Sequence, residues 1–154
     1  MRKVGFIGVG IMGKSMVRNL MKAGFELHIY ARNRAKVEDV IGEGALFHDS
    51  IAACVKGCET VITIVGFPQD VEEVYFDEGG ILESADAGAY LIDMTTTSPQ
   101  ISVNISKEGE EKGFHVLDAP VTGGDTGAKA GTLSILVGGK EEDFEACMPL
   151  FEAM

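Results

Sequence analysis

The feature that most constrains the fold is a set of three glycines near the start of the chain, in the stretch VGFIGVGIMG. Gly8, Gly10 and Gly13 follow an apolar run that predicts a strand over residues 3–7. They precede residues 11–24, where apolar side chains recur with the period of a helix. The sequence therefore predicts a strand and a helix joined by a tight, glycine-rich loop.

A glycine loop in this position can bind the diphosphate of a dinucleotide. Gly8 would make the tight turn, Gly10 would let the diphosphate approach the backbone, and Gly13 would let the helix pack close to the strand. The free amides and the positive dipole end at the start of the helix would favour the negative charge. The alternative is a purely structural turn, but the strand before the loop and the helix after it favour dinucleotide binding.

The end of the second predicted strand bears on which dinucleotide would bind. Proteins that bind NAD usually have an acidic residue here, which holds the ribose hydroxyls, but this chain has Ala31. Arg32, Asn33, Arg34 and Lys36 follow it and supply the positive charge and amide donors that a 2′-phosphate requires. We therefore expect NADP as the cofactor, with NAD as the other candidate. The alternative for this cluster is an ordinary solvated helix start.

Short apolar runs alternate with helical segments along the rest of the chain. The further strands are predicted at 26–31, 60–65, 89–94, 114–119 and 132–139, and the further helices at 34–44, after Ser50, at 68–76, from Ser98 and Pro99, and from about Glu141. Pro149 predicts a kink or a break in the last helix. Strands separated by helices pair in parallel through right-handed crossovers. The predicted fold is α/β, a doubly wound and mostly parallel sheet of the Rossmann type.

Composition and charge limit the classes of partner. A chain of 154 residues that is 45% hydrophobic can form one compact domain, here residues 1–154, without a metal or disulfide. Its net charge of −11, with no basic run, argues against binding nucleic acid or a membrane surface. Cys54, Cys58 and Cys147 lack metal-binding spacing and are expected to be reduced thiols. We expect no metal site, no leader and no membrane span, and therefore a cytoplasmic protein.

A second glycine-rich segment, residues 118–139, follows the strand predicted at 114–119. Thr122, Gly123 and Gly124 fall just beyond the carboxyl end of that strand, the edge of the sheet where ligands bind in this architecture. A hydroxyl followed by glycine amides can bind a carboxylate near the backbone. The spacing alone leaves this interpretation and a flexible connecting loop equally open.

Three motifs in order, GFIGVGIMGKSMVRNLMKAG, LIDMTTTSP and DAPVTGGDTGAKAGTLSILVGG, carry a family resemblance. Over essentially its whole length, the chain resembles the β-hydroxyacid dehydrogenases, the group of 3-hydroxyisobutyrate dehydrogenase and tartronate semialdehyde reductase, which is related more distantly to 6-phosphogluconate dehydrogenase. The resemblance implies hydride transfer between a nicotinamide cofactor and a small 3-hydroxy acid or semialdehyde acid. It favours carboxylate binding over a flexible loop for the second glycine-rich segment.

The resemblance also implies roles for individual residues. The cofactor would contact Gly8, Val9, Gly10, Ile11, Met12, Gly13, Arg32, Asn33, Val65, Gly66, Thr95 and Thr96, and the substrate carboxylate would contact Thr122, Gly123 and Gly124. Arg32 matches the arginine that holds the 2′-phosphate, and Thr95 and Thr96 match hydroxyl residues near the nicotinamide ribose. The chain departs from the family pattern at Ala31, usually asparagine or aspartate, at Gly66, often proline, and at Thr122, more commonly serine.

The family's general acid and base, a lysine on a long helix after the dinucleotide domain, has no counterpart among the lysines of residues 1–154, and neither has the helical second domain. We therefore expect this chain to bind NADP(H) without turnover, and the full-length parent to be an active homo-oligomer. Three alternatives stay open: a non-catalytic dinucleotide-sensing domain, a 6-phosphogluconate dehydrogenase-like enzyme, and a methyltransferase-like domain that binds S-adenosylmethionine. Ala31 to Arg34 speak against the last, because such a site requires an acidic residue at the end of the second strand.

Overall fold

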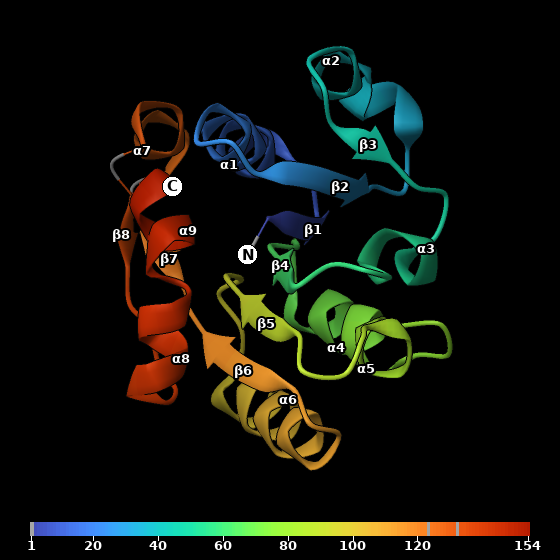
Figure 1. The fold of residues 1–154 in the computed structure, drawn as a ribbon, viewed down its shortest axis with the longest axis vertical. Coiled ribbons are helices and arrows are strands. Elements are labelled where there is room, and N and C mark those ends of the chain that lie inside the picture. The colour runs from blue at the N-terminus through green and yellow to red at the C-terminus, as the bar shows by residue number, and fades with distance from the viewer. Residues whose placement is uncertain (1, 123, 132) are drawn as a thin grey trace.

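A parallel sheet with helices on both faces forms the body of the molecule (Figure 1). The computed structural model describes residues 2–122, 124–131 and 133–154. The strands of the main sheet are β1 (Lys3–Ile7), β2 (Glu26–Tyr30), β3 (Leu46–Phe47), β4 (Thr60–Thr63), β5 (Tyr90–Asp93) and β6 (His115–Asp118). They lie in the order β3-β2-β1-β4-β5-β6, and every neighbouring pair is parallel. This is the order of a doubly wound dinucleotide-binding fold, which confirms the predicted fold class.

The position of β1 creates the crevice where a ligand can bind. From β1 the chain crosses to β2 on one side, with Ile7 opposite Tyr30, and later returns to β4 on the other side, with Ile7 opposite Thr63. The strand order therefore reverses between β1 and β4. At such a reversal the loops after the two strands turn in opposite directions and leave a space at their carboxyl ends.

Helices cover the two faces of the sheet. The helical segments are α1 (Ile11–Lys22), η1 (Arg34–Val37), α2 (Glu38–Gly42), α3 (Ile51–Val55), α4 (Pro68–Phe76), α5 (Ile81–Ser84), α6 (Pro99–Glu111), α7 (Gly124–Ala130), α8 (Glu141–Ala146) and α9 (Met148–Ala153). One apolar core packs α1, η1, α2 and α9 against the sheet, and a second core packs α3, α4, α5 and α6 against the opposite face (Figure 1). Burial on both faces matches the central strands β1, β4 and β5, which are almost fully buried, whereas β2 alternates between buried and half-buried residues.

Local signals in the sequence set several helix ends. The Ser50 hydroxyl accepts a hydrogen bond from the Ala53 amide at 3.1 Å, and the Ser98 hydroxyl accepts one from the Ile101 amide at 3.3 Å. Pro99 is the first residue of α6, where its missing amide hydrogen has no consequence. The break predicted at Pro149 is also confirmed, because α8 ends before Cys147 and α9 follows it.

The region after β6 differs from the prediction. The strand predicted over 132–139 is wrong in its extent: β8 covers Ser134–Ile135, which pair antiparallel with β7 (Val121–Thr122). Between β7 and β8 lies α7, which the sequence did not predict. Small residues let α7 approach α1, and the Asn19 side-chain amide donates to the Ala128 carbonyl at 2.7 Å.

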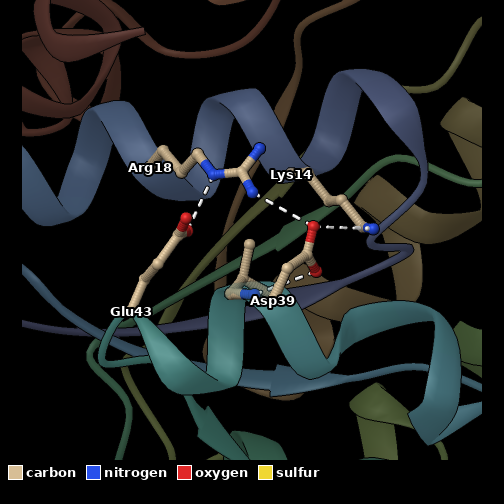
Figure 2. A network of polar contacts seen from close by, with 5 residues as sticks. Lys14, Arg18, Asp39 and Glu43 are labelled. Atoms are coloured by element: carbon tan, nitrogen blue, oxygen red, sulfur yellow. Dashed lines mark hydrogen bonds and ion pairs between the residues drawn. The ribbon is translucent and has the colours of Figure 1, made fainter.

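An ion-pair network links α1 to α2 (Figure 2). Lys14 Nζ and Arg18 Nη2 each lie 3.1 Å from Asp39 Oδ2, and Arg18 Nε lies 2.7 Å from Glu43 Oε2. The hydrogen bond from Lys14 is the main reason that the pKa of Asp39 lies below its ordinary value. The network fastens the segment after β2 to the helix that follows β1.

Candidate functional site

A cleft of about 470 Å³ opens at the carboxyl ends of β1, β2 and β4, where the strand order reverses. Three connections form its walls: the glycine loop before α1, the β2–η1 segment, and the loop between β4 and α4. Its lining residues are Ile7, Gly8, Val9, Gly10, Tyr30, Ala31, Arg32, Asn33, Lys36, Val37, Ile64, Val65, Gly66, Asp70 and Val74. The cleft therefore lies where the switch-point rule for open α/β sheets places a ligand.

The three glycines of the first loop meet three different surroundings. A Cβ at Gly8 would overlap the carbonyl oxygen of Ile64, and the φ of Gly8 is +97°, a conformation that side chains disfavour. A Cβ at Gly13 would lie 2.5 Å from the Gly8 carbonyl oxygen, so this glycine lets α1 pack on the loop. A Cβ at Gly10 would meet no atom within 4 Å, and Gly10 lines the cleft.

Gly10 is also the N-cap of α1, and the amides of the first helical turn start beside it. No side chain caps this end of the helix, and its first turn contains no acidic residue. The first amides of a helix have no acceptor inside the helix, and the positive end of the helix dipole lies with them. Bare backbone, free donors and open space together fit a diphosphate, which supplies the missing acceptors and charge.

Cations line the opposite wall. Arg32 and Lys36 both face the cleft, and the Arg32 side chain is 72% exposed. The Asn33 side chain lines the cleft but also accepts a hydrogen bond from the Ala35 amide at 3.1 Å, which begins η1. Arg34 is not among the lining residues; its guanidinium lies over the Phe47 ring, 5.2 Å from the centroid. The cation cluster predicted from the sequence therefore divides into two groups.

A buried hydrogen-bond network holds the loop after β4, which forms one wall of the cleft. The Val65 amide donates to the Thr95 hydroxyl at 3.0 Å, and the Thr95 amide donates to Asp93 Oδ1 at 3.1 Å. Thr95 is buried and is not a lining residue. In this structure it supports the wall of the cleft from below.

Asp93 is the centre of this buried network. It is 4% exposed, and its Oδ1 also accepts from the Thr63 hydroxyl at 2.9 Å, whereas Oδ2 has no partner among the described residues. Burial is the main cause that raises the pKa of Asp93 above its ordinary value, and Asp118 adds to the rise. The Tyr75 hydroxyl extends the network, 2.9 Å from Thr63 Oγ1.

The other predicted cofactor residues lie outside the cleft lining. Ile11 is 69% exposed at the start of α1, Met12 is half-buried, Gly13 is buried, and Thr96 is exposed in the loop after β5. In this structure the cleft contains Gly8, Val9, Gly10, Arg32, Asn33, Val65 and Gly66 of that set. The predicted contacts of the remaining residues stay predictions.

The predicted carboxylate-binding residues lie after β6. Thr122 is exposed at the end of β7, opposite Ser134, and Gly124 begins α7 with a φ of +58°. Gly123 lies outside the described residues. Neither Thr122 nor Gly124 lines the cleft, so substrate binding at this segment also stays a prediction.

Sequence reasoning missed the part of the cleft that α4 contributes. Asp70 and Val74, from its first two turns, line the cleft beside Gly66. The available signal was Pro68, which starts a helix directly after the strand next to β1. The first turns of such a helix lie at the same edge of the sheet as the glycine loop.

The thiols are buried away from the cleft. Burial raises the pKa of Cys54 and of Cys147 to about 12 and that of Cys58 to about 11, and none of the three forms a disulfide. In the described ranges, no cluster of three or more histidine, cysteine or acidic side chains could hold a metal ion. No helix within those ranges has the length and hydropathy needed to cross a membrane.

Known proteins resemble this chain in sequence and in structure. Residues 3–154 match the family described as the NAD binding domain of 6-phosphogluconate dehydrogenase. An uncharacterized oxidoreductase of Bacillus subtilis, YkwC, is 48% identical over 153 residues, which are 99% of this chain and 53% of the relative. The chain thus spans about half the length of this curated relative.

Solved structures share the fold closely. A 3-hydroxyisobutyrate dehydrogenase of Mycobacterium tuberculosis, solved with L-serine, matches with a TM-score of 0.94 and 30% identity over 100% of this chain and 52% of that one. A protein described as Psf3 in complex with NADP+ and 2-OPP matches with a TM-score of 0.93 and 30% identity over 97% of this chain and 53% of that one. The similarity extends across the sheet and across the segments that form the cleft.

Proposed function

Because the chain belongs to the family of the NAD-binding domain of 6-phosphogluconate dehydrogenase and is a domain of the β-hydroxyacid dehydrogenase group, we propose that it binds NADP(H) in the cleft between β1, β2 and β4. The observation that carries the proposal is the open face of Gly10 at the uncapped start of α1. This is the point of the cleft where backbone donors, a favourable dipole and free space coincide.

The preference for NADP over NAD rests on the end of β2. Ala31 supplies no carboxylate to accept from ribose hydroxyls, whereas Arg32 and Lys36 face the cleft and can bind a 2′-phosphate. The solved relative described as a complex with NADP+ supports the same preference.

We propose that the whole protein transfers a hydride between the nicotinamide and a small 3-hydroxy acid or semialdehyde acid. The bound cofactor would supply the hydride chemistry. The amides at the start of α1 would hold the diphosphate, and Arg32 and Lys36 would hold the 2′-phosphate. Val65, which Thr95 positions, forms the adjoining wall of the cleft. The name of the solved relative from Mycobacterium tuberculosis, 3-hydroxyisobutyrate dehydrogenase, supports this substrate class.

The substrate carboxylate would bind at the segment of Thr122, Gly123 and Gly124. The support is its place directly after β6, at the carboxyl edge of the parallel sheet, together with the exposed hydroxyl of Thr122. Since none of the lysines in residues 1–154 stands in the family's catalytic motif, we propose that this chain binds the cofactor without turnover. Loss of a general acid typically lowers a rate by about 10²–10⁴.

Calorimetric titration of the 154-residue chain with NADPH and NADH tests the proposal. We expect both to bind, NADPH more tightly, and we expect Arg32→Ala to remove most of the difference. The control is Lys22→Ala, which removes the same charge from an exposed side chain in the last turn of α1, far from the cleft. Equal affinities for NADPH and NADH would exclude the NADP preference, and binding of neither would exclude the proposed function.

A further inference from the structure

Arg32 does not face the cleft freely, because carboxylates of α4 hold its guanidinium. Arg32 Nη2 lies 3.2 Å from Glu73 Oε2 and 3.5 Å from Asp70 Oδ1. Arg32 comes from the segment after β2 and the two carboxylates come from α4, so these contacts connect opposite walls of the cleft. A phosphate that binds Arg32 must compete with them.

The two carboxylates differ in what else they do. Asp70 has a side chain that is 22% exposed, and its Oδ2 accepts a hydrogen bond from the Phe67 amide at 3.0 Å, which stabilises the first turn of α4. The Glu73 side chain is 54% exposed, and its polar contact within the described residues is Arg32. Replacing Glu73 therefore removes the shorter of the two carboxylate contacts of Arg32 without removing a bond that α4 needs.

The guanidinium also has room to turn. Arg32, Tyr30 and Val74 line both the main cleft and a neighbouring hollow of about 260 Å³, which Glu73 borders as well. The Arg32 side chain therefore lies between two open spaces.

Charge decides how strongly Glu73 competes. Arg32 faces two carboxylates, so the group of three has a net charge of about −1 before any ligand binds. The adenosine 2′-phosphate would add nearly two further negative charges near Glu73, whereas the 2′-hydroxyl of NAD adds none. Repulsion and competition therefore act on NADP(H) and spare NAD(H).

We propose that Glu73 determines cofactor specificity by competing with the 2′-phosphate for Arg32, which weakens NADP(H) binding and narrows the preference for NADP over NAD. The inference rests on the proposed function, since it requires that the cleft binds a dinucleotide. Glu73 would act on cofactor binding through its contact with Arg32 and would not contact the cofactor itself.

Glu73→Gln keeps the size of the side chain and removes its charge, and Glu72→Gln is the matched control. Glu72 is exposed on the same helix and lines a separate hollow formed with α6, so it reports the general effect of one fewer negative charge on α4. Each variant is made alone and together with Arg32→Ala, and melting curves of all variants establish that they are folded. NADPH and NADH are titrated at about 50 mM salt, where screening is moderate.

We expect Glu73→Gln to tighten NADPH binding about three- to fivefold, the upper part of the range for an exposed ion pair, and to leave NADH binding within about twofold. Glu72→Gln should change NADPH binding by less than half as much. In the Arg32→Ala background, Glu73→Gln should have no larger effect than Glu72→Gln, because the guanidinium for which Glu73 and the phosphate compete is absent.

The outcomes separate the inference from the function on which it rests. Unchanged or weaker NADPH binding by Glu73→Gln would overturn the inference and leave the proposed function intact; weaker binding would mean that Glu73 holds Arg32 in position for the phosphate. Equal effects of Glu73→Gln and Glu72→Gln would also overturn it, since a general field would then explain both. If the parent chain binds neither dinucleotide, the proposed function fails and the inference fails with it.

Discussion

The substitution Gly10→Ala is expected to weaken cofactor binding strongly while changing the stability of the fold very little. Gly10 has a φ of −86°, which alanine adopts readily, and a Cβ there would meet no atom within 4 Å. The added methyl group would project into the cleft beside the first amides of α1. It is therefore expected to displace a bound diphosphate while leaving the protein's own packing unchanged.

The expected effect of Gly10→Ala on stability is small because two terms offset each other. Alanine is a poorer N-cap than glycine by about 0.5–1 kcal/mol. The substitution also reduces the freedom of the unfolded chain, which contributes about 0.4–1 kcal/mol in the opposite direction. The free energy of unfolding should change by less than about 1 kcal/mol, and the melting temperature by no more than about 4 °C for a chain of this size.

The expected effect on binding is much larger. Hydrogen bonds to a charged group are worth about 1.5–3 kcal/mol each. Losing the closest contact between the backbone and the diphosphate should therefore weaken both NADPH and NADH by about 10- to 100-fold. The loss should be similar for the two cofactors, because they share the diphosphate and differ at the 2′ position.

Gly13→Ala provides the comparison. Its Cβ would lie 2.5 Å from the Gly8 carbonyl oxygen and 3.3 Å from the Phe6 ring, so the backbone or α1 must shift. Such overpacking costs about 1–3 kcal/mol. Calorimetric titration and thermal melts on the same preparations separate the two variants: Gly13→Ala should lose stability and Gly10→Ala should not. If Gly10→Ala binds NADPH as the parent does, or melts as early as Gly13→Ala, the assignment of the diphosphate to this loop is wrong.

Three further predictions concern the supporting structure. Thr95→Val should weaken NADPH binding several-fold by releasing the Val65 amide, and Thr95→Ser should restore it; a valine variant with unchanged affinity in the titration would exclude this support. The pKa of Asp93 is raised in the folded state, so the free energy of unfolding of the parent should rise relative to that of Asp93→Asn as the pH falls through this raised pKa toward the ordinary value of 3.8. Urea unfolding of both proteins at several pH values checks the sign of this change. Arg18→Met should lower the melting temperature at low ionic strength and have little effect in about 1 M salt; a salt-independent effect would mean that packing, not charge, links α1 to α2.

The parts of the fold that follow local rules were predictable. Gly8, Gly10 and Gly13 stand between a strand and a helix, and Ser98 with Pro99 begins α6, because each of these positions depends on a few neighbouring residues. The parallel sheet follows from the alternation of strands with helices. The glycine loop and the segment after β2, which were predicted to bind one cofactor, both line the cleft at one edge of the sheet.

The parts that depend on distant partners were not predictable in the same way. The sequence of α7 has no clear apolar face, and the helix depends on its packing against α1. The strand β8 depends on antiparallel pairing with β7, which precedes α7 in the chain. The bond between Thr95 and Val65 follows from the register of β4 and β5, in which Thr63 lies opposite Asp93, so a register argument could have found it.

Lys14 lies in the first turn of α1, yet Asp39 already compensates its charge (Figure 2). Under the proposed function, the diphosphate would therefore be bound by neutral backbone donors, whereas the 2′-phosphate would be bound by side-chain cations. Mobile ions weaken the second kind of attraction far more than the first. Ionic strength should then act as a selector: in a dilute medium the protein distinguishes the two nicotinamide cofactors, and in a concentrated one it treats them nearly alike.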